Sequence, residues 1–240
     1  MIRDVAGSYR RALQATVAHY SGWRPTPAHI DELKGEGCWN NDWDASLELL
    51  RRYGSCVPER QELIEIFSEF YFGGDPEGDP DNWTGFISDE PLLVEASLFQ
   101  TIHHLGWTWG FFSGAEPQSA RFVLEQRLGL ESPPLIAMGD APDKPDPTGL
   151  LQLSEALLTG NGITTVAYLG DTVADVHAVL RAREACPSRN WVSLGIAPPH
   201  LHPLEEQRHS YEQQLRDAGA DHILTSTTAV SDWLRSTTQH

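Results

Sequence analysis

Residues 166–175 read VAYLGDTVAD, and this stretch decides the fold. Its first half is a short apolar run of the kind that forms a buried strand. Gly170 turns the chain, and Asp171 follows at the point where such a strand ends. Asp175 lies one helical turn further on, on the same side as Asp171. The stretch therefore predicts a buried strand that delivers two carboxylates to the start of a helix.

The same pattern of a strand followed by a helix recurs from about residue 85 to the end of the chain. Short apolar strands that alternate with helices predict a parallel sheet with right-handed crossovers. Strands are expected at residues 107–114, 133–139, 163–170, 190–195 and 221–226, and helices at 95–106, 118–129, 147–158, 172–185, 211–220 and 227–236. Ligands of such sheets bind beyond the carboxyl ends of the strands.

Residues 8–84 have a different pattern, which predicts a small all-helical bundle. Ser8 is the expected N-cap of the first helix, and Thr26 is the expected N-cap of the second, with Pro27 at its first position. The four helices are expected at residues 8–19, 26–35, 42–54 and 58–73.

The overall charge excludes one class of partner. The 240 residues include 34 acidic and 17 basic side chains, which give a formal net charge of -17. A nucleic-acid partner is therefore not expected, because it requires a basic surface. No apolar run reaches membrane-spanning length, so no membrane partner is expected either. Three widely spaced cysteines are typical of reduced thiols, and together these features favour a cytoplasmic protein.

Polar residues also follow the two preceding strands. Ser113 and Gly114 end the first, where a hydroxyl and open backbone N–H groups suit a phosphate; a simple turn is the alternative. Lys144 follows the second strand, where Pro145 favours an extended backbone and leaves the ammonium able to neutralise a phosphoryl group. A solvated loop lysine is the alternative, although the sequence holds only one other lysine, Lys34.

Asp171 and Asp175 are expected to converge at one point after the third strand. Two carboxylates suit Mg²⁺, which prefers oxygen ligands. As an alternative, both acids stabilise the amino end of the helix that follows. A hydroxyl, a lysine and carboxylates from three successive strands together indicate phosphoryl chemistry.

These motifs resemble those of the haloacid dehalogenase-like hydrolase superfamily, in the group with a small helical cap inserted after the first strand. Ser113-Gly114 matches the second family motif, Lys144 in DKPDP the third, and Asp171 with Asp175 the fourth. The resemblance covers nearly the whole length. It implies a Rossmann-like parallel sheet core at residues 1–7 and 85–240, with an inserted all-helical cap at residues 8–84.

The resemblance also implies site roles. Ser113, Gly114 and Lys144 would hold the phosphoryl group. Asp171 would bind the cofactor Mg²⁺, and Asp175 would support the metal or orient Lys144. The partner would be a small phosphorylated metabolite.

The first family motif, an apolar strand that ends in D-x-D-G, is missing. D-x-D occurs at residues 42–44 and 79–81, but neither follows an expected strand. Residues 1–4, MIRD, resemble the tail of the motif, so we expect both catalytic aspartates just upstream of Met1, because the start was placed too late. The central first strand would then be absent. The chain as given is expected to be inactive and poorly stable, to rearrange its core, or to form a homodimer that covers the gap.

Residues 34–43 form a polar and aromatic loop between two cap helices. In related capped proteins, the loop that follows Leu-Lys-Gly sets substrate specificity, so Lys34, Asn40, Asn41 and Asp42 are substrate candidates. As an alternative, Asn41 caps the next helix and the tryptophans pack in the bundle.

Two functions follow from the resemblance. The complete gene product is expected to be an Mg²⁺-dependent phosphatase that hydrolyses a small phosphomonoester through an aspartyl-phosphate. The alternative is a non-catalytic protein that keeps the scaffold and binds a phosphorylated metabolite or another protein chain.

Overall fold

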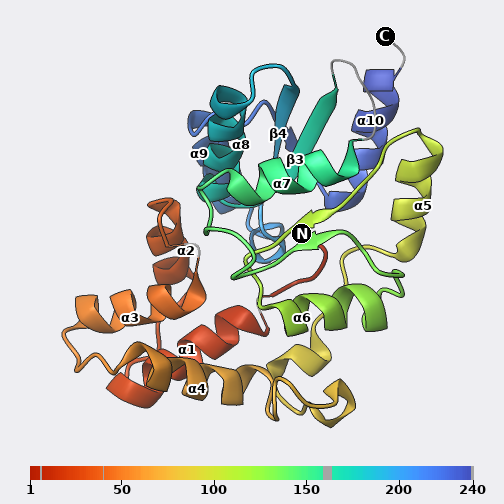
Figure 1. The fold of residues 1–240 in the computed structure, drawn as a ribbon. Helices are drawn as coiled ribbons and strands as arrows, with labels where there is room; N and C mark the ends of the chain where they lie inside the picture. Colours follow the sequence, from red (N-terminus) through yellow and green to blue (C-terminus); the bar gives the residue numbers. More distant parts are fainter. Residues whose placement is uncertain (6, 40, 159–163, 239–240) are drawn as a thin grey trace. The chain divides into compact units, whose positions relative to one another are not determined.

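A computed structural model describes residues 1–5, 7–39, 41–158 and 164–238 (Figure 1). The chain divides into two compact units. Residues Met1–Ile2 and Leu92–His240 form one, which we call the core unit, and Arg3–Pro91 form the other, which we call the helical unit. None of the helices in the described residues combines the length and apolar character needed to cross a membrane.

The regular elements of the helical unit are all helices among its described residues, as the sequence predicts. They are α1 (Tyr9–Ser21), α2 (Pro27–Gly35), α3 (Asp42–Tyr53), α4 (Arg60–Tyr71) and the short 3-10 helices η1 (Pro80–Asn82) and η2 (Phe86–Asp89). Their apolar faces share a core that includes Leu13, Leu50 and Phe67, all fully buried. Burial of such side chains supplies most of the stability of short helices.

One predicted helix cap is confirmed in full, and the other, Ser8 at the N-cap of α1, is confirmed in position only. The Thr26 side chain accepts a hydrogen bond from the backbone N–H of His29, with Pro27 at the first helical position. Ser8 makes no side-chain cap to α1. Its hydroxyl donates instead to the buried carboxylate of Glu90. The buried carboxylate needs donors, whereas the Arg10 N–H in the first turn of α1 already donates to the Val5 carbonyl at 3.1 Å.

The core unit alternates strands and helices, as predicted. Its strands are β1 (Phe111–Phe112), β2 (Leu135–Ile136), β3 (Thr165–Gly170), β4 (Asn190–Ile196) and β5 (His222–Leu224). Its helices are α5 (Ala96–His104), α6 (Pro117–Arg121) with a π-helical continuation η3 (Phe122–Arg127), α7 (Thr148–Leu157), α8 (Val173–Ala185), η4 (Pro199–Leu201), α9 (Glu205–Asp217), η5 (Thr227–Ala229) and α10 (Val230–Thr238).

Three predicted bounds of the core unit are wrong. The strands expected at residues 107–114 and 133–139 are only two residues long each, because β1 and β2 pair with each other alone. The helix expected at residues 211–220 begins at Glu205 instead. Glu205 and Glu206 lie in its first turn, where acidic side chains favour a helix start.

All strand pairs of the core unit are parallel, but they form two separate sheets among the described residues. One has the order β1-β2 and the other the order β3-β4-β5. An apolar cluster spans both sheets, with Phe112 from β1, Leu153 from α7, Val179 from α8 and Trp191 from β4. Helices α7 and α8 therefore hold the two sheets together, although no ladder joins β1 to β3.

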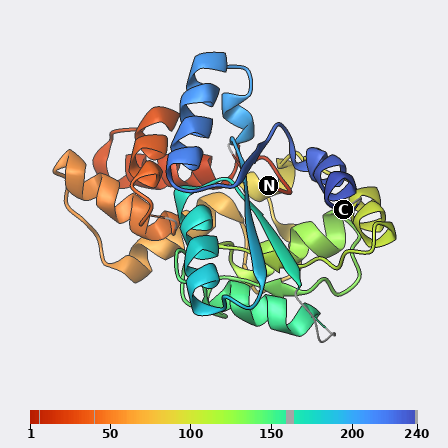
Figure 2. The same ribbon diagram turned by 90° about the horizontal axis from the view of Figure 1, so that it is seen from above.

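A second apolar cluster packs against the two-stranded sheet. It joins Phe99 of α5 and Leu234 of α10 to the partly buried Phe111 and Leu135. The terminal helix α10 accordingly lies beside α5 in both views (Figures 1 and 2). These clusters fix the strands whose carboxyl ends carry the polar residues described next.

Candidate functional site

Ser113 follows β1 directly and is fixed by two backbone interactions. Its N–H donates to the carbonyl of Ile136 at 2.9 Å. Its Oγ accepts a hydrogen bond from the backbone N–H of Ala115 at 3.1 Å. The residue thus forms the turn that the sequence offers as an alternative. Among the described residues, no acceptor takes the Ser113 O–H proton, so the hydroxyl can still donate to a ligand.

Lys144 reaches the carboxyl ends of two strands from the loop after β2. Its Nζ lies 2.6 Å from Asp175 Oδ1, 3.0 Å from the Tyr168 hydroxyl and 3.4 Å from the Phe112 carbonyl oxygen. Only 8% of its side chain is exposed. The alternative of a solvated loop lysine is therefore wrong, and the ammonium lies between β1, β3 and the start of α8.

Asp175 accepts hydrogen bonds on both carboxylate oxygens. Oδ1 faces Lys144 and Tyr168, whereas Oδ2 accepts from the backbone N–H of Asp171 at 3.1 Å and of Thr172 at 3.0 Å. The Thr172 hydroxyl also donates to Oδ2 at 2.8 Å. Thr172 is the N-cap of α8, so Asp175 completes a capping box. Donors of the chain itself therefore occupy both carboxylate oxygens. This favours a role for Asp175 in orienting Lys144 over a role in binding a metal.

Mutual stabilisation of opposite charges dominates this buried cluster. Burial alone raises the pKa of Asp175, but the charge of Lys144 and the hydrogen bonds from Thr172 outweigh it, so the pKa lies below its ordinary value. Burial likewise lowers the pKa of Lys144, but the charge of Asp175 raises it well above the ordinary value. Burial and the Asp175 charge raise the pKa of Tyr168. At neutral pH the cluster holds one cation, one anion and a neutral phenol.

Asp171 directly follows the last residue of β3, and its carboxylate is available to a ligand. Among the described residues this carboxylate has no hydrogen-bond or ion-pair partner, whereas the backbone carbonyl accepts from the Tyr211 hydroxyl at 2.8 Å. The described residues contain no group of three or more His, Cys, Asp or Glu side chains placed to hold a metal ion. Asp171 therefore fits a magnesium site only as a single carboxylate ligand, with water and a phosphate as the other ligands.

Gly170 allows the end of β3 to lie against the side chain of Asp175. A Cβ at this position would lie 2.3 Å from Cβ and 2.5 Å from Cγ of Asp175. Such separations are far inside van der Waals contact. The glycine in the predicted motif is therefore needed for close packing of β3 against the first turn of α8.

Tyr168, the third member of the cluster, was not among the residues that the sequence indicated. Strand alternation places Tyr168 and Gly170 on the same side of β3. A tyrosine inside a buried strand needs a hydrogen-bond partner for its hydroxyl, and this requirement is the signal that could have identified it.

Three of the four substrate candidates of the helical unit lie among the described residues, where they contact one another or cap a helix. Lys34 pairs with Asp42 at 2.8 Å. Asn41 Oδ1 accepts from the backbone N–H groups of Trp43 and Asp44, which makes Asn41 the N-cap of α3. Asn40 lies outside the described residues. The structural alternative for Asn41 is thus confirmed, and the substrate roles of the other three stay predictions.

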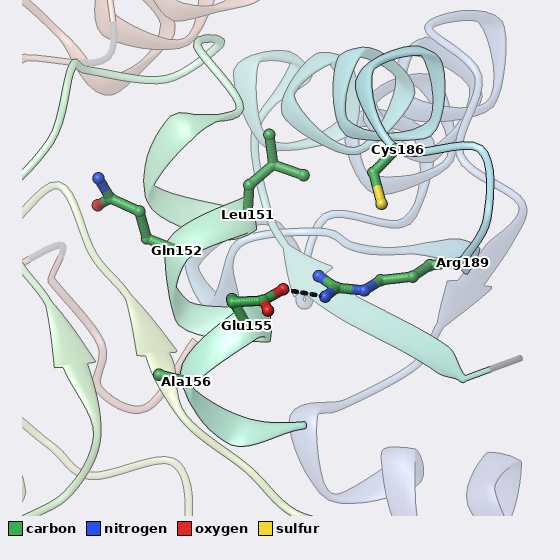
Figure 3. Close-up of a pocket in the computed structure, with 6 residues that line it drawn as sticks. All are labelled: Leu151, Gln152, Glu155, Ala156, Cys186 and Arg189. Carbon is green, nitrogen blue, oxygen red and sulfur yellow. Dashed lines mark hydrogen bonds and ion pairs between the residues drawn. The ribbon is translucent and has the colours of Figure 1, made fainter. Parts of the chain in front are cut away.

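Figure 3 shows an open pocket at a different place in the core unit, between α7 and the loop that joins α8 to β4. Its Arg189 pairs with Glu155 and donates to the Ser154 hydroxyl. Arg189 immediately precedes β4, so the pocket lies at the amino end of that strand. It is separate from the cluster at the carboxyl ends. Its lining residues are Leu151, Gln152, Glu155, Ala156, Cys186 and Arg189.

Similar solved structures identify the fold of this chain. No family model and no curated protein matches the sequence. A phosphonoacetaldehyde hydrolase-like protein from Oleispira antarctica is similar in structure, with a TM-score of 0.70 and 15% identity, over 100% of this chain and 89% of that one. A haloacid dehalogenase-like hydrolase from Bacteroides fragilis has a TM-score of 0.67 and 13% identity, over 96% of this chain and 94% of that one. The chain therefore has the fold of haloacid dehalogenase-like hydrolases, as its motifs predict.

Proposed function

We propose that the core unit binds the phosphoryl group of a small phosphomonoester and belongs to an Mg²⁺-dependent phosphatase. The observation that carries this proposal is the buried ammonium of Lys144, held 2.6 Å from Asp175 at the carboxyl ends of β1 and β3. Ser113, the neighbour of Phe112 in the chain, has a hydroxyl that can donate, and Asp171, whose backbone N–H donates to Asp175, has a carboxylate that can take a metal. These are the groups that phosphoryl transfer uses.

The three contacts of Lys144 differ in strength, which explains how the ammonium can serve a ligand. The contact to the Phe112 carbonyl is the longest, at 3.4 Å, and hence the weakest. A phosphoryl oxygen can replace this contact while the shorter one to Asp175 persists. The Ser113 O–H and the backbone N–H of Gly114 would donate to the same phosphoryl group from the end of β1.

Asp171 would supply one oxygen ligand to Mg²⁺, and the bound ion would neutralise phosphoryl charge. Asp175 is not assigned to the metal, because Lys144, Tyr168, Thr172 and the backbone N–H of Asp171 use its oxygens. Its role in this proposal is to fix the orientation of Lys144.

Hydrolysis through an aspartyl-phosphate also needs a second, unpaired carboxylate. Asp171 is assigned to the metal and Asp175 is paired, so we assign the nucleophile to the first motif of the family resemblance, an apolar strand that ends in D-x-D-G. The nucleophile would attack phosphorus and expel the alcohol of the ester, and water would then cleave the acyl phosphate.

The alternative is a protein that binds a phosphorylated metabolite without turnover. It needs only the groups around Lys144 and no second carboxylate as a nucleophile. Both functions share the phosphate site, so they differ in turnover and not in where the ligand binds.

The test is an assay of phosphate-ester hydrolysis with Mg²⁺, for the 240-residue chain and for a version extended by the upstream codons. The phosphatase proposal expects hydrolysis in the extended version, and loss of it in its Lys144→Met variant. Arg121→Met is the matched control, because Arg121 forms an exposed pair with Glu125. Phosphate binding by both versions, without turnover across a broad ester panel, would favour the binding protein. Absence of phosphate binding in both would overturn the proposal.

A further inference from the structure

The side of β3 that faces away from β4 has no strand partner among the described residues. The Asn190 N–H donates to the Thr164 carbonyl, and the register pairs Thr165 with Asn190. In a parallel ladder alternate residues face each neighbour, so Ala167 and Leu169 direct their N–H and C=O groups to the other side. Both residues are only partly buried. The edge of β3 is therefore open.

The edge of β1 is open in the same way. The N–H groups of Phe111 and Ser113 donate to carbonyls of the β2 segment, at 2.8 Å and 2.9 Å. Phe112, between them, therefore directs its backbone groups away from β2. A buried carbonyl without a donor is costly, so this edge needs a substitute for a ladder partner.

Tyr168 provides that substitute with its side chain. Its hydroxyl lies 2.9 Å from the Phe112 carbonyl oxygen, so it reaches from the open edge of β3 to the open edge of β1. It also accepts from Lys144 Nζ at 3.0 Å and lies 3.1 Å from Asp175 Oδ1. A phenol has one proton, so it can donate either to the Phe112 carbonyl or to Asp175, but not to both.

We propose that Tyr168 is a positioning residue for Lys144: the Tyr168 hydroxyl accepts from the ammonium and gives its own proton to the Phe112 carbonyl, because Lys144 already neutralises Asp175. While Lys144 neutralises Asp175, the phenol donates to the Phe112 carbonyl. When the ammonium turns from the Phe112 carbonyl toward a phosphoryl oxygen, it stays paired with Asp175, and the phenol remains the donor to that carbonyl. The inference rests on the proposed function for its ligand, but the contact of Tyr168 with Lys144 is tested separately.

The lysine content makes a direct test practical. The sequence contains only Lys34 and Lys144, so a sample labelled with ¹⁵N at lysine Nζ gives two NMR signals, which a Lys34→Arg variant assigns. Lys34 pairs with Asp42 in the helical unit and serves as the internal reference. In Tyr168→Phe we expect the Lys144 signal to move and that of Lys34 to stay. An unmoved Lys144 signal in a folded variant would overturn the proposed contact.

Inorganic phosphate with Mg²⁺ then tests the positioning role. Without the hydroxyl, the Phe112 carbonyl depends on Lys144 for its donor, so the ammonium turns less easily from that carbonyl to a phosphoryl oxygen. We expect Tyr168→Phe to bind phosphate roughly tenfold more weakly, as for loss of one hydrogen bond involving charged groups. Tyr20→Phe removes a hydroxyl bonded to the Glu62 carbonyl in the other unit and should bind normally.

The outcomes separate the two proposals. If the wild type binds no phosphate, the proposed function fails, and the shift of the Lys144 signal alone decides whether Tyr168 holds the ammonium. If the wild type binds phosphate and Tyr168→Phe binds it equally well, with the fold intact by circular dichroism, the positioning role is wrong. An equal loss of phosphate affinity in Tyr168→Phe and Tyr20→Phe would also contradict the positioning role.

Discussion

Lys144 and Asp175 form a buried ion pair, 2.6 Å apart, with 8% and 5% of their side chains exposed. The pair joins the loop after β2 to the first turn of α8. Breaking a buried pair by removing one partner leaves the other charge without compensation, which costs far more than loss of a surface pair. The structure of the core unit and its chemistry therefore depend on the same two residues.

Lys144→Met should destabilise the core unit by about 3–5 kcal/mol, because it leaves the Asp175 carboxylate buried without its cation. Urea unfolding followed by circular dichroism measures the loss. The control Arg121→Met removes an exposed i,i+4 pair and should change stability by less than about 1 kcal/mol. Similar losses in the two variants would show that the Lys144 pair is solvated.

The free energy of unfolding should depend on pH through the titration of the Asp175 carboxyl. Its pKa in the folded chain lies below the ordinary value of 3.8, so its contribution is present above that pH and is lost as the pH falls through the folded value. Asp175→Asn should remove this part of the acid dependence. The free energy of unfolding, measured for both proteins from neutral pH downward, tests it. Parallel curves for the two proteins would contradict the lowered pKa.

Gly170→Ala should disrupt the site through shape alone. The added Cβ would lie 2.3 Å from Asp175 Cβ, so β3 and α8 would have to separate. We expect the free energy of unfolding to fall by about 1–3 kcal/mol, which is typical of overpacking, and phosphate binding to weaken. Gly7→Ala is the control, because a Cβ there would have no atom within 4 Å. A fully stable Gly170→Ala that binds phosphate normally would refute the close approach.

The helical unit contains its own buried ion pair. Arg3 lies 2.6 Å from Glu90, and the Tyr71 and Ser8 hydroxyls contact the same two side chains. Glu90→Gln should therefore destabilise this unit by about 3 kcal/mol, because Arg3 keeps its charge in a buried place. The exposed Glu69→Gln is the control. Thermal unfolding that is unchanged in Glu90→Gln would count against a structural role for the pair.

The sequence could indicate the strand-end residues because each has a local signature. A glycine turn followed by two acids one helical turn apart located Asp171 and Asp175, and the fixed backbone of DKPDP located Lys144. The structure distinguishes the two acids. The Asp171 carboxylate is available to a ligand, whereas both oxygens of Asp175 accept hydrogen bonds within the chain. That division depends on which donors surround each carboxylate, and donors from other elements leave no local pattern.

Tyr168 and Ser8 show why the rest could not be predicted. Tyr168 contacts the Phe112 carbonyl, 56 positions away in the chain, across a break between two sheets. Ser8 bonds to Glu90, 82 positions away, and so gives up the cap that its local sequence favours. Both outcomes follow from buried polar groups that need partners. Pairings of this kind become visible only once the tertiary structure is known.

The most direct test of the account is the ¹⁵Nζ signal of Lys144 during titration with inorganic phosphate in the presence of Mg²⁺. The account predicts a saturable shift of the Lys144 signal, no shift of the Lys34 signal, and a weaker response in Asp171→Asn. A Lys144 signal that does not respond to phosphate, or one that moves no more than that of Lys34, would contradict the assignment of this site to phosphoryl binding.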